Sequence, residues 1–383
     1  MTRQAFFGGI LAAFVGFASS FAVVLKGLTS VGASPAQAAS GLMALAVAMG
    51  VCAIVLSLWY RQPISIAWST PGGALLASSV VPDGGFQAAV GAFLLSGALI
   101  VIAGLWRPLG RAVAAIPPSL ANAMLAGVLL SLCLAPIHAV AVTPAMALPV
   151  ILVWAVVWRF WRLYAVPAAV AVMVVLLMFQ GPANETVDWL AAPMVMVPVW
   201  STSAMIGLAL PLFLVTMASQ NIPGMAVLAV NGYTPPAGPL FRVTGLFTLL
   251  AAPFGGHAVN LAAITAALCA GPDAHPDPAR RYWAAVVAGA TYIVFGLLAG
   301  AATSLIAVSP PVLIEAVAGL ALLGALGGAL MGAMAEADGR EAALITFLVT
   351  ASGLSFFGIS GAFWGLLAGG AMRALIRSRP NPA

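Results

Sequence analysis

The stretch PISIAWSTPGGALL, from Pro63 to Leu76, places two prolines, a glycine pair and three hydroxyl side chains between long apolar runs. Within it, STPGG supplies a hydroxyl suited to capping a helix, a proline suited to the first turn and glycines that allow close approach. A similar interruption, APFGGHAVNLAAIT, spans Ala252 to Thr265. Each stretch predicts a helix that begins inside an otherwise apolar segment.

Composition indicates what surrounds these two stretches. The chain has 383 residues, of which 63% are hydrophobic and only 6% are charged. A soluble protein needs about a quarter of its residues charged, so we predict an integral membrane protein. The apolar runs are long and rich in Ala, Leu, Val and Gly, which favours an all-α fold over a barrel of strands. The three cysteines have neither metal-ligand nor disulfide spacing.

Charged residues mark where the chain leaves the bilayer, and they divide it into fourteen predicted transmembrane segments. Placing the N-terminus in the cytoplasm puts all fourteen basic residues except Lys26 on the inner side. This agrees with the positive-inside rule, so both termini are predicted to be cytoplasmic. The same rule accounts for the net charge of +5, so no nucleic-acid partner is needed to explain it. The approximate segment cores are 5–25, 35–58, 63–80, 85–106, 117–137, 144–160, 164–180, 203–230, 238–252, 254–270, 280–303, 310–334, 341–356 and 358–376.

The longest predicted external loop, about 181–201, separates seven segments from seven. An odd number of segments in each half means that the second half enters the membrane from the opposite side. This 7+7 inverted repeat is the plan of many secondary transporters. The two interrupted segments are then the third of each half, and we predict that both contain half-helices.

A helix that begins at mid-membrane has unpaired N–H groups and the positive end of its dipole there. Two such N-termini facing one cavity would form an anion site without a basic side chain. The alternative is that both stretches are proline kinks in packed helices. The predicted substrate-binding residues on the two interrupted segments are Ser69, Thr70, Gly72, Gly255, Gly256, His257 and Asn260.

Polar side chains at membrane depth add further candidates, because burying them in lipid is costly. Gln220 and Asn221 of the eighth segment are predicted to line the site, together with Phe17, Ser20 and Phe21 of the first segment. Helix packing or interhelical hydrogen bonding is the alternative role for the polar members of this set.

His257 is the one histidine predicted at mid-membrane, and it is our candidate for proton coupling because imidazole changes charge near neutral pH. We expect His138 and His275 at loop edges in contact with solvent. No Asp or Glu is predicted at mid-membrane. A site of helix N-termini, hydroxyls, amides and one histidine suits a carboxylate substrate, and the phenylalanines suit an aromatic body attached to it. No metal or cofactor is predicted.

At these residues the chain resembles the benzoate–proton symporters. The resemblance rests on PISIAWSTPGGALL, on ASQNIPGMAVLAVNGY (218–233) and on PPAGPLFRVTGLFTLLAAPFGGHAVNLAAITAAL (235–268), and it covers nearly the whole chain. That family resembles a larger group of nucleobase symporters and sulfate-type anion transporters. The nucleobase relatives carry acidic residues on segments eight and ten, where this chain has Gln220, Asn221 and Asn260. This departure argues against a nucleobase substrate and leaves the proton carrier open.

The resemblance implies short extended pieces leading into half-helices three and ten, a core domain, a gate domain and often a homodimer. The corresponding expected parts are 1–106 (core, segments 1–4), 107–180 (gate, segments 5–7), 181–202 (external linker), 203–303 (core, segments 8–11) and 304–383 (gate, segments 12–14).

The prediction is therefore a bacterial inner-membrane secondary transporter that imports benzoate or a related aromatic carboxylate with a proton by alternating access. The alternatives are a transporter of another organic anion or a nucleobase, and a passive anion channel. An enzyme is not expected, because three dispersed histidines and no mid-membrane acid cluster leave little for metal or acid–base catalysis. No nucleotide-binding motif supports ATP drive.

Overall fold

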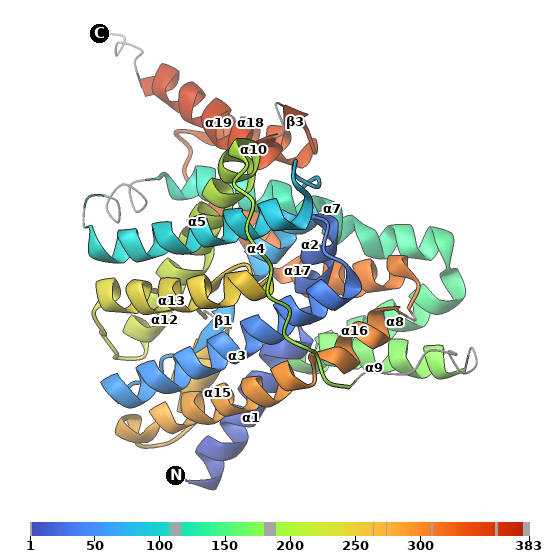
Figure 1. Cartoon of the computed structure of the whole chain (residues 1–383), viewed down its shortest axis with the longest axis vertical. Helices are drawn as coiled ribbons and strands as arrows, with labels where there is room; N and C mark the ends of the chain where they lie inside the picture. Colours follow the sequence, from blue (N-terminus) through green and yellow to red (C-terminus); the bar gives the residue numbers. More distant parts are fainter. Residues whose placement is uncertain are drawn as a thin grey trace.

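The computed structural model describes residues 2–106, 108, 116–179, 189–262, 264–272, 274–307, 309–356 and 359–377. Most of these residues lie in helices, and long helices pack side by side through most of the molecule (Figure 1). Seven helical spans are long and apolar enough to cross a membrane, and three shorter apolar helices accompany them in the described part of the chain. The count of fourteen crossings stays a prediction.

One set of helices packs around α3 (Pro35–Tyr60), and we call it the α3 group. α15 and α13 both pack on α3, α5 packs on α13, α1 packs on α15, and α2 packs on α4 (Figure 1). Glycines bring some of these helices into close contact, since a Cβ on Gly50 of α3 would collide with the carbonyl of Gly289 in α15. The bounds are α1 (Arg3–Ala18), α2 (Phe21–Ser30), α5 (Gly85–Leu105), α13 (Ala237–Ala251) and α15 (Tyr282–Leu297).

The eighth predicted segment is one helical span that contains two π-helical turns. It contains α10 (Thr202–Ala204), the π-helical turn η2 (Met205–Ala209), α11 (Leu210–Thr216), a second π-helical turn η3 (Met217–Asn221) and α12 (Ile222–Val230). π-Helical turns are rare in proteins, and where they occur they often lie at functional sites. The second turn contains Gln220 and Asn221, two of the three amides predicted for the site.

A second set of helices packs around α7 (Pro118–Val142), and we call it the α7 group. α17, α18 and α19 all contact α7, while α8 packs on α9. The β3–β4 hairpin joins α18 to α19 at the top of Figure 1. The bounds are α8 (Pro144–Phe160), η1 (Arg162–Tyr164), α9 (Ala165–Met178), α17 (Pro311–Ala333), α18 (Arg340–Ala351), β3 (Ser355–Phe356), β4 (Ile359–Ser360) and α19 (Gly361–Arg377).

The two interrupted segments meet in a short antiparallel sheet between β1 (Ile66–Trp68) and β2 (Val259–Leu261). β1 leads into α4 (Thr70–Ala77), and β2 leads towards α14 (Ile264–Ala270). We call β1 with α4 the first broken segment, and β2 with α14 the second broken segment. The extended pieces and the half-helices that follow them are as expected, and the kink alternative is wrong for both segments.

Several segment boundaries differ from the sequence prediction. The first segment is not one helix, because α1 ends at Ala18 and α2 begins at Phe21. α7 continues through Pro136 to Val142, whereas its core was expected to end at 137. The eleventh segment divides after Leu297, and α16 (Ala299–Ala307) follows as a separate helix.

Residues 189–201 contain neither helix nor strand and cross the α3 group as an extended chain (Figure 1). Met194 N donates to Ser40 Oγ at 2.9 Å, and Met196 N donates to the carbonyl of Pro253 at 2.7 Å. The rest of the predicted external linker lies outside the described residues, apart from the start of α10.

Candidate substrate site at the paired broken segments

The register of the small sheet determines which residues face each other across the site. Ala67 lies opposite Asn260, and Trp68 lies opposite Val259. The pairing continues past the strand ends, since Ser69 N donates to the carbonyl of Ala258 at 3.0 Å. The start of α4 therefore lies beside the residues that immediately precede β2.

The N-terminus of α4 is held by two hydroxyl groups. Ser69 is the N-cap residue, and its Oγ accepts a hydrogen bond of 3.1 Å from Gly72 N. Thr216 Oγ1, on α11, donates to the same Ser69 Oγ at 2.9 Å. Ser69 and Thr216 are both fully buried. Sequence reasoning missed Thr216, although a hydroxyl four residues before Gln220 at membrane depth was a usable signal.

Thr70 is the first residue of α4 and is only half-buried. Its N–H has no acceptor among the described residues, while Gly73 N is paired with the carbonyl of Ser69. Since Pro71 has no N–H, Thr70 supplies the open backbone donor of this helix start. Position 72 favours glycine, because a Cβ there would lie only 2.8 Å from Ser69 Oγ.

The three predicted amides occupy different environments. Asn221 Oδ1 accepts from Leu261 N at 2.9 Å, so this buried amide attaches η3 to β2. Asn260 is also buried, and in the amide orientation that satisfies both ends its oxygen accepts from Ser69 N at 2.8 Å. Gln220 is half-buried, and its side-chain amide forms no hydrogen bond with the described residues. Gln220 is therefore the amide with donors and an acceptor still available.

His257 is completely buried and lies against the first broken segment. Its Nδ1 accepts a 2.6 Å hydrogen bond from Ala258 N, and its Nε2 has no partner among the described residues. A Cβ built on Gly73 would lie 3.5 Å from Nε2, so the ring faces the first turn of α4. With Nδ1 acting as an acceptor, a neutral ring carries its hydrogen on Nε2.

The predicted position of the second half-helix start was wrong. PFGGH does not begin α14, because Gly255 adopts a φ of 91° and terminates the short turn η4 (Ala252–Phe254) that follows α13. Gly256 N then donates to the carbonyl of Ala251 at 3.0 Å. Gly255 and Gly256 form a chain reversal before β2, and α14 begins only at Ile264.

The start of α14 has different chemistry from the start of α4. The two residues before Ile264 are alanines, which have no side-chain oxygen for capping. Thr265 shares a 2.8 Å hydrogen bond with Ser65, and both hydroxyl residues are buried. At the other end of α14, Arg281 Nη1 donates to the carbonyl of Ala270 at 2.8 Å. A cation there complements the negative end of the helix dipole.

The break in the first segment brings aromatic rings to β1. Ser20 Oγ accepts a 2.8 Å hydrogen bond from Trp68 Nε1 and donates to the carbonyl of Gly16 at 3.0 Å. The Phe17 ring is 5.2 Å from Trp68 and 5.8 Å from Phe21, between ring centroids, and it is half-buried. Phe17 and Ser20 therefore lie beside Trp68 of β1, and Phe21 stacks on Phe17; their role in lining the substrate site stays a prediction. Sequence reasoning missed Trp68 and also Phe295, whose ring centroid lies 5.2 Å from that of Phe17.

The other histidines correct a second expectation. His275 is only 7% exposed, and its Nδ1 accepts from Asp277 N at 2.9 Å, so it is a structural residue of the loop before α15. His138 is exposed, but it lies within α7 rather than at a loop edge, and its contact with solvent stays a prediction. Among the described residues, no group of three His, Cys, Asp or Glu side chains could hold a metal ion.

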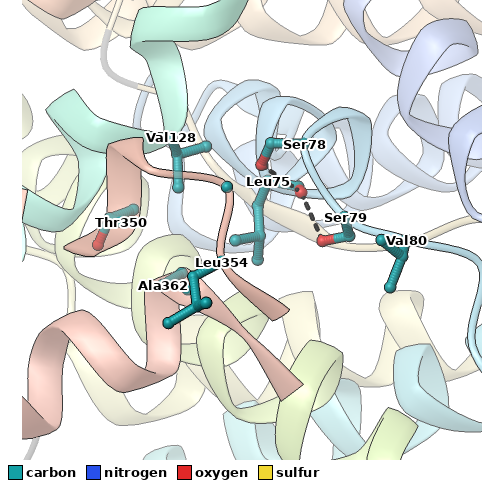
Figure 2. A pocket seen from close by; sticks show the side chains of 10 residues that line it. Leu75, Ser78, Ser79, Val80, Val128, Thr350, Leu354 and Ala362 are labelled. Carbon is teal, nitrogen blue, oxygen red and sulfur yellow. Dashed lines mark hydrogen bonds between the residues drawn. The ribbon is translucent and has the colours of Figure 1, made fainter. Parts of the chain in front are cut away.

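A small pocket lies at the far end of α4, away from the predicted site residues (Figure 2). Leu75 faces Val128 of α7 and Ala362 of α19 across this pocket. Ser78 and Ser79 both donate to the carbonyl of Leu75, at 2.9 Å and 2.7 Å. The pocket therefore marks the seam between α4, which packs on α2 of the α3 group, and the α7 group.

Comparison with known protein families identifies the family to which the chain belongs. The family model described as "Benzoate membrane transport protein" matches residues 1–375. The chain belongs to this family. Among family relatives, the "Benzoate membrane transport protein" of Acinetobacter baylyi is 34% identical over 363 residues, covering 94% of this chain and 92% of the relative. The "Inner membrane protein YdcO" of Escherichia coli K12 is 43% identical over 364 residues, covering 94% of this chain and 93% of the relative.

Solved structures give this benzoate transport family member a known fold. The transmembrane domain of the cyanobacterial bicarbonate transporter BicA aligns with a TM-score of 0.65 at 16% identity, covering 96% of this chain and 97% of that domain. SLC26A9 aligns with a TM-score of 0.65 at 13% identity, covering 98% of this chain but only 65% of the SLC26A9 chain. At these identities the likeness establishes the fold of a helical membrane protein.

Proposed function

We propose that this protein imports benzoate or a related aromatic carboxylate together with a proton. The single observation that carries the proposal is the pairing of β1 with β2. The pairing brings the hydroxyl-capped start of α4, where the N–H of Thr70 is open, close to the residues before β2, and His257 Nε2, which has no partner among the described residues, faces Gly73 in the first turn of α4. Membership of the benzoate transport family, and a relative that bears the name benzoate membrane transport protein, support the same substrate.

In this proposal the carboxylate binds at the start of α4. Thr70 offers its N–H and its hydroxyl, and the Gln220 amide offers a further N–H from η3. The positive end of the α4 dipole favours a negative charge at this point. The aromatic ring of the substrate packs against Phe17, which is half-buried like Thr70 and Gln220.

His257 then couples proton binding to anion binding. A second proton on its ring would put a full positive charge beside the first turn of α4, where the carboxylate binds. Binding of either ligand therefore strengthens binding of the other, since linkage is reciprocal. Protonation of Nδ1 also requires the ring to give up its bond with Ala258 N, which lies directly before β2. The proton site is thus tied to the backbone of the second broken segment.

Alternating access is the transport cycle that we propose for this fold. The α3 group, with the eighth segment and both broken segments, forms the core, and the α7 group forms the gate. The core moves against the gate and carries the site from one membrane face to the other. We place the protein in the bacterial inner membrane with both termini in the cytoplasm, and a homodimer is the proposed assembly.

Uptake of labelled benzoate by proteoliposomes, with and without an imposed pH gradient, tests this function. The proposal predicts uphill accumulation when the outside is more acidic, and loss of accumulation when a protonophore removes the gradient. Competition by unlabelled aromatic carboxylates, other organic anions and nucleobases defines the substrate class. Uptake that only equilibrates across the membrane would instead indicate a passive channel.

A further inference from the structure

One ion pair connects the α3 group with the α7 group. Lys26 Nζ of α2 lies 2.7 Å from Glu315 Oε1 of α17, and the two side chains are 32% and 33% exposed. The other ion pairs among the described residues, Arg280 with Asp277 and Arg373 with Glu336, do not join these two groups. Lys26 is also the single basic residue that the topology prediction places on the outer side.

Each partner of this pair belongs to a helix that is closely packed within its own group. Gly27, next to Lys26, contacts the carbonyl of Gly73 in α4. Gly319, one turn after Glu315, contacts the carbonyl of Leu132 in α7. α2 and α17 lie next to each other (Figure 1), so the ion pair spans the seam between two firmly packed bodies. Lys26 is one residue away from Gly27, where α2 contacts α4.

We infer that the Lys26–Glu315 pair is a latch that closes the outer side of the seam and opens once in every transport cycle. The inference rests on the proposed alternating access. Because both side chains are partly exposed, water can replace the pair on opening, and the attraction is weak enough to be reversible. When the latch is closed, α2 holds the start of α4 in place through Gly27 and Gly73.

Labelling of a cysteine in the seam tests the latch without reference to any substrate. Leu75 is fully buried and lines the pocket between α4 and α19 (Figure 2), so Leu75→Cys reports opening of this seam. The three native cysteines, Cys52, Cys133 and Cys269, are first replaced by alanine. Labelling by a membrane-impermeant thiol reagent is expected to be severalfold faster in Lys26→Gln and in Glu315→Gln than in the parent.

Charge exchange and a matched control keep this test specific. The double variant Lys26→Glu with Glu315→Lys is expected to return labelling to within about twofold of the parent. Arg280→Gln breaks an ion pair inside one loop and is expected to leave labelling unchanged. Unchanged labelling in both single variants, or no recovery in the charge exchange, would overturn the latch.

Cross-linking then asks whether opening is required for transport. In Lys26→Cys with Glu315→Cys, a short cleavable bifunctional thiol reagent should stop uptake, and reduction should restore it. If the cross-linked protein transports at the rate of the untreated protein, the pair does not open and the inference is wrong. A protein that labels as predicted yet shows no benzoate uptake in any variant would retain the latch and refute the proposed substrate.

Discussion

The first and second broken segments share one plan but differ in their chemistry. α4 has eight residues, begins at a serine cap, is supported by Thr216 and faces His257. α14 has seven residues, follows two alanines and has Arg281 at its C-terminal carbonyl. Two broken segments can therefore share an extended strand followed by a short helix while the chemistry at the two helix starts differs. We therefore propose that anion recognition belongs mainly to α4, and that α14 mainly supports β2.

Replacing His257 should have the largest effect on transport. His257→Gln keeps a polar group beside α4 but cannot take up a proton near neutral pH, so uphill benzoate uptake should be lost and the pH dependence of binding should flatten. Proteoliposome uptake and benzoate binding from pH 5 to 8 measure both. His138→Gln, an exposed histidine of α7, is the control and should behave as the parent. If His257→Gln still accumulates benzoate with parental pH dependence, the proton travels elsewhere.

Replacing the two adjacent amides of η3, Gln220 and Asn221, should affect benzoate affinity and protein stability separately. Gln220→Ala loses a donor to the carboxylate, so benzoate affinity should fall about tenfold to a hundredfold, for a bond to a charged group of about 1.5–3 kcal/mol. Asn221→Ala leaves the buried Leu261 N–H without its acceptor, so it should lower the thermal stability of the purified protein. Equal affinity in Gln220→Ala and the parent would remove Gln220 from the site.

Two buried threonines provide a matched comparison between the broken segments. Thr216 bonds to Ser69 beside α4, and Thr265 bonds to Ser65 beside α14. Each valine variant loses one hydroxyl contact of about 0.5–1.5 kcal/mol. Thr216→Val should weaken benzoate binding about two- to tenfold, because Ser69 positions the start of α4, whereas Thr265→Val should leave affinity unchanged. The reverse result in calorimetric titrations would assign recognition to the second broken segment.

The smallest expected effect is at the far end of α14. Arg281→Gln removes the cation from the carbonyl of Ala270, which should cost about 0.3–1 kcal/mol of stability. Benzoate affinity should remain at the parental value, since the proposed site lies at α4. Thermal unfolding and calorimetry on the same preparation check both parts. A loss of affinity larger than the loss of stability would mean that α14 contributes directly to anion binding.

Much of this architecture could be predicted from local sequence. Long uncharged runs specify membrane segments, and STPGG specifies a capped helix start because each of its residues has a defined role there. APFGGH was misread because its glycines serve another purpose, with Gly255 at positive φ ending a turn. The true start of α14, at Ile264, follows alanines and has no comparable signal.

The remaining features depend on contacts between distant residues. The register that puts Ala67 opposite Asn260 joins two halves of the chain, and nothing local to either strand specifies it. The same holds for Thr216 at Ser69 and for Trp68 at Ser20. His275 was misplaced because a loop histidine can be buried by its own backbone contacts, here with Asp277.

The central claim is that a carboxylate binds at the start of α4 rather than at the start of α14. Both helices have a threonine in the first turn, Thr70 and Thr265, so NMR of the purified protein with [15N]threonine compares them directly. Thr70→Ser and Thr265→Ser assign the two signals. We predict that benzoate shifts the Thr70 amide resonance saturably, with the affinity found by calorimetry, and leaves Thr265 nearly unchanged. A saturable shift at Thr265 with none at Thr70 would contradict the claim.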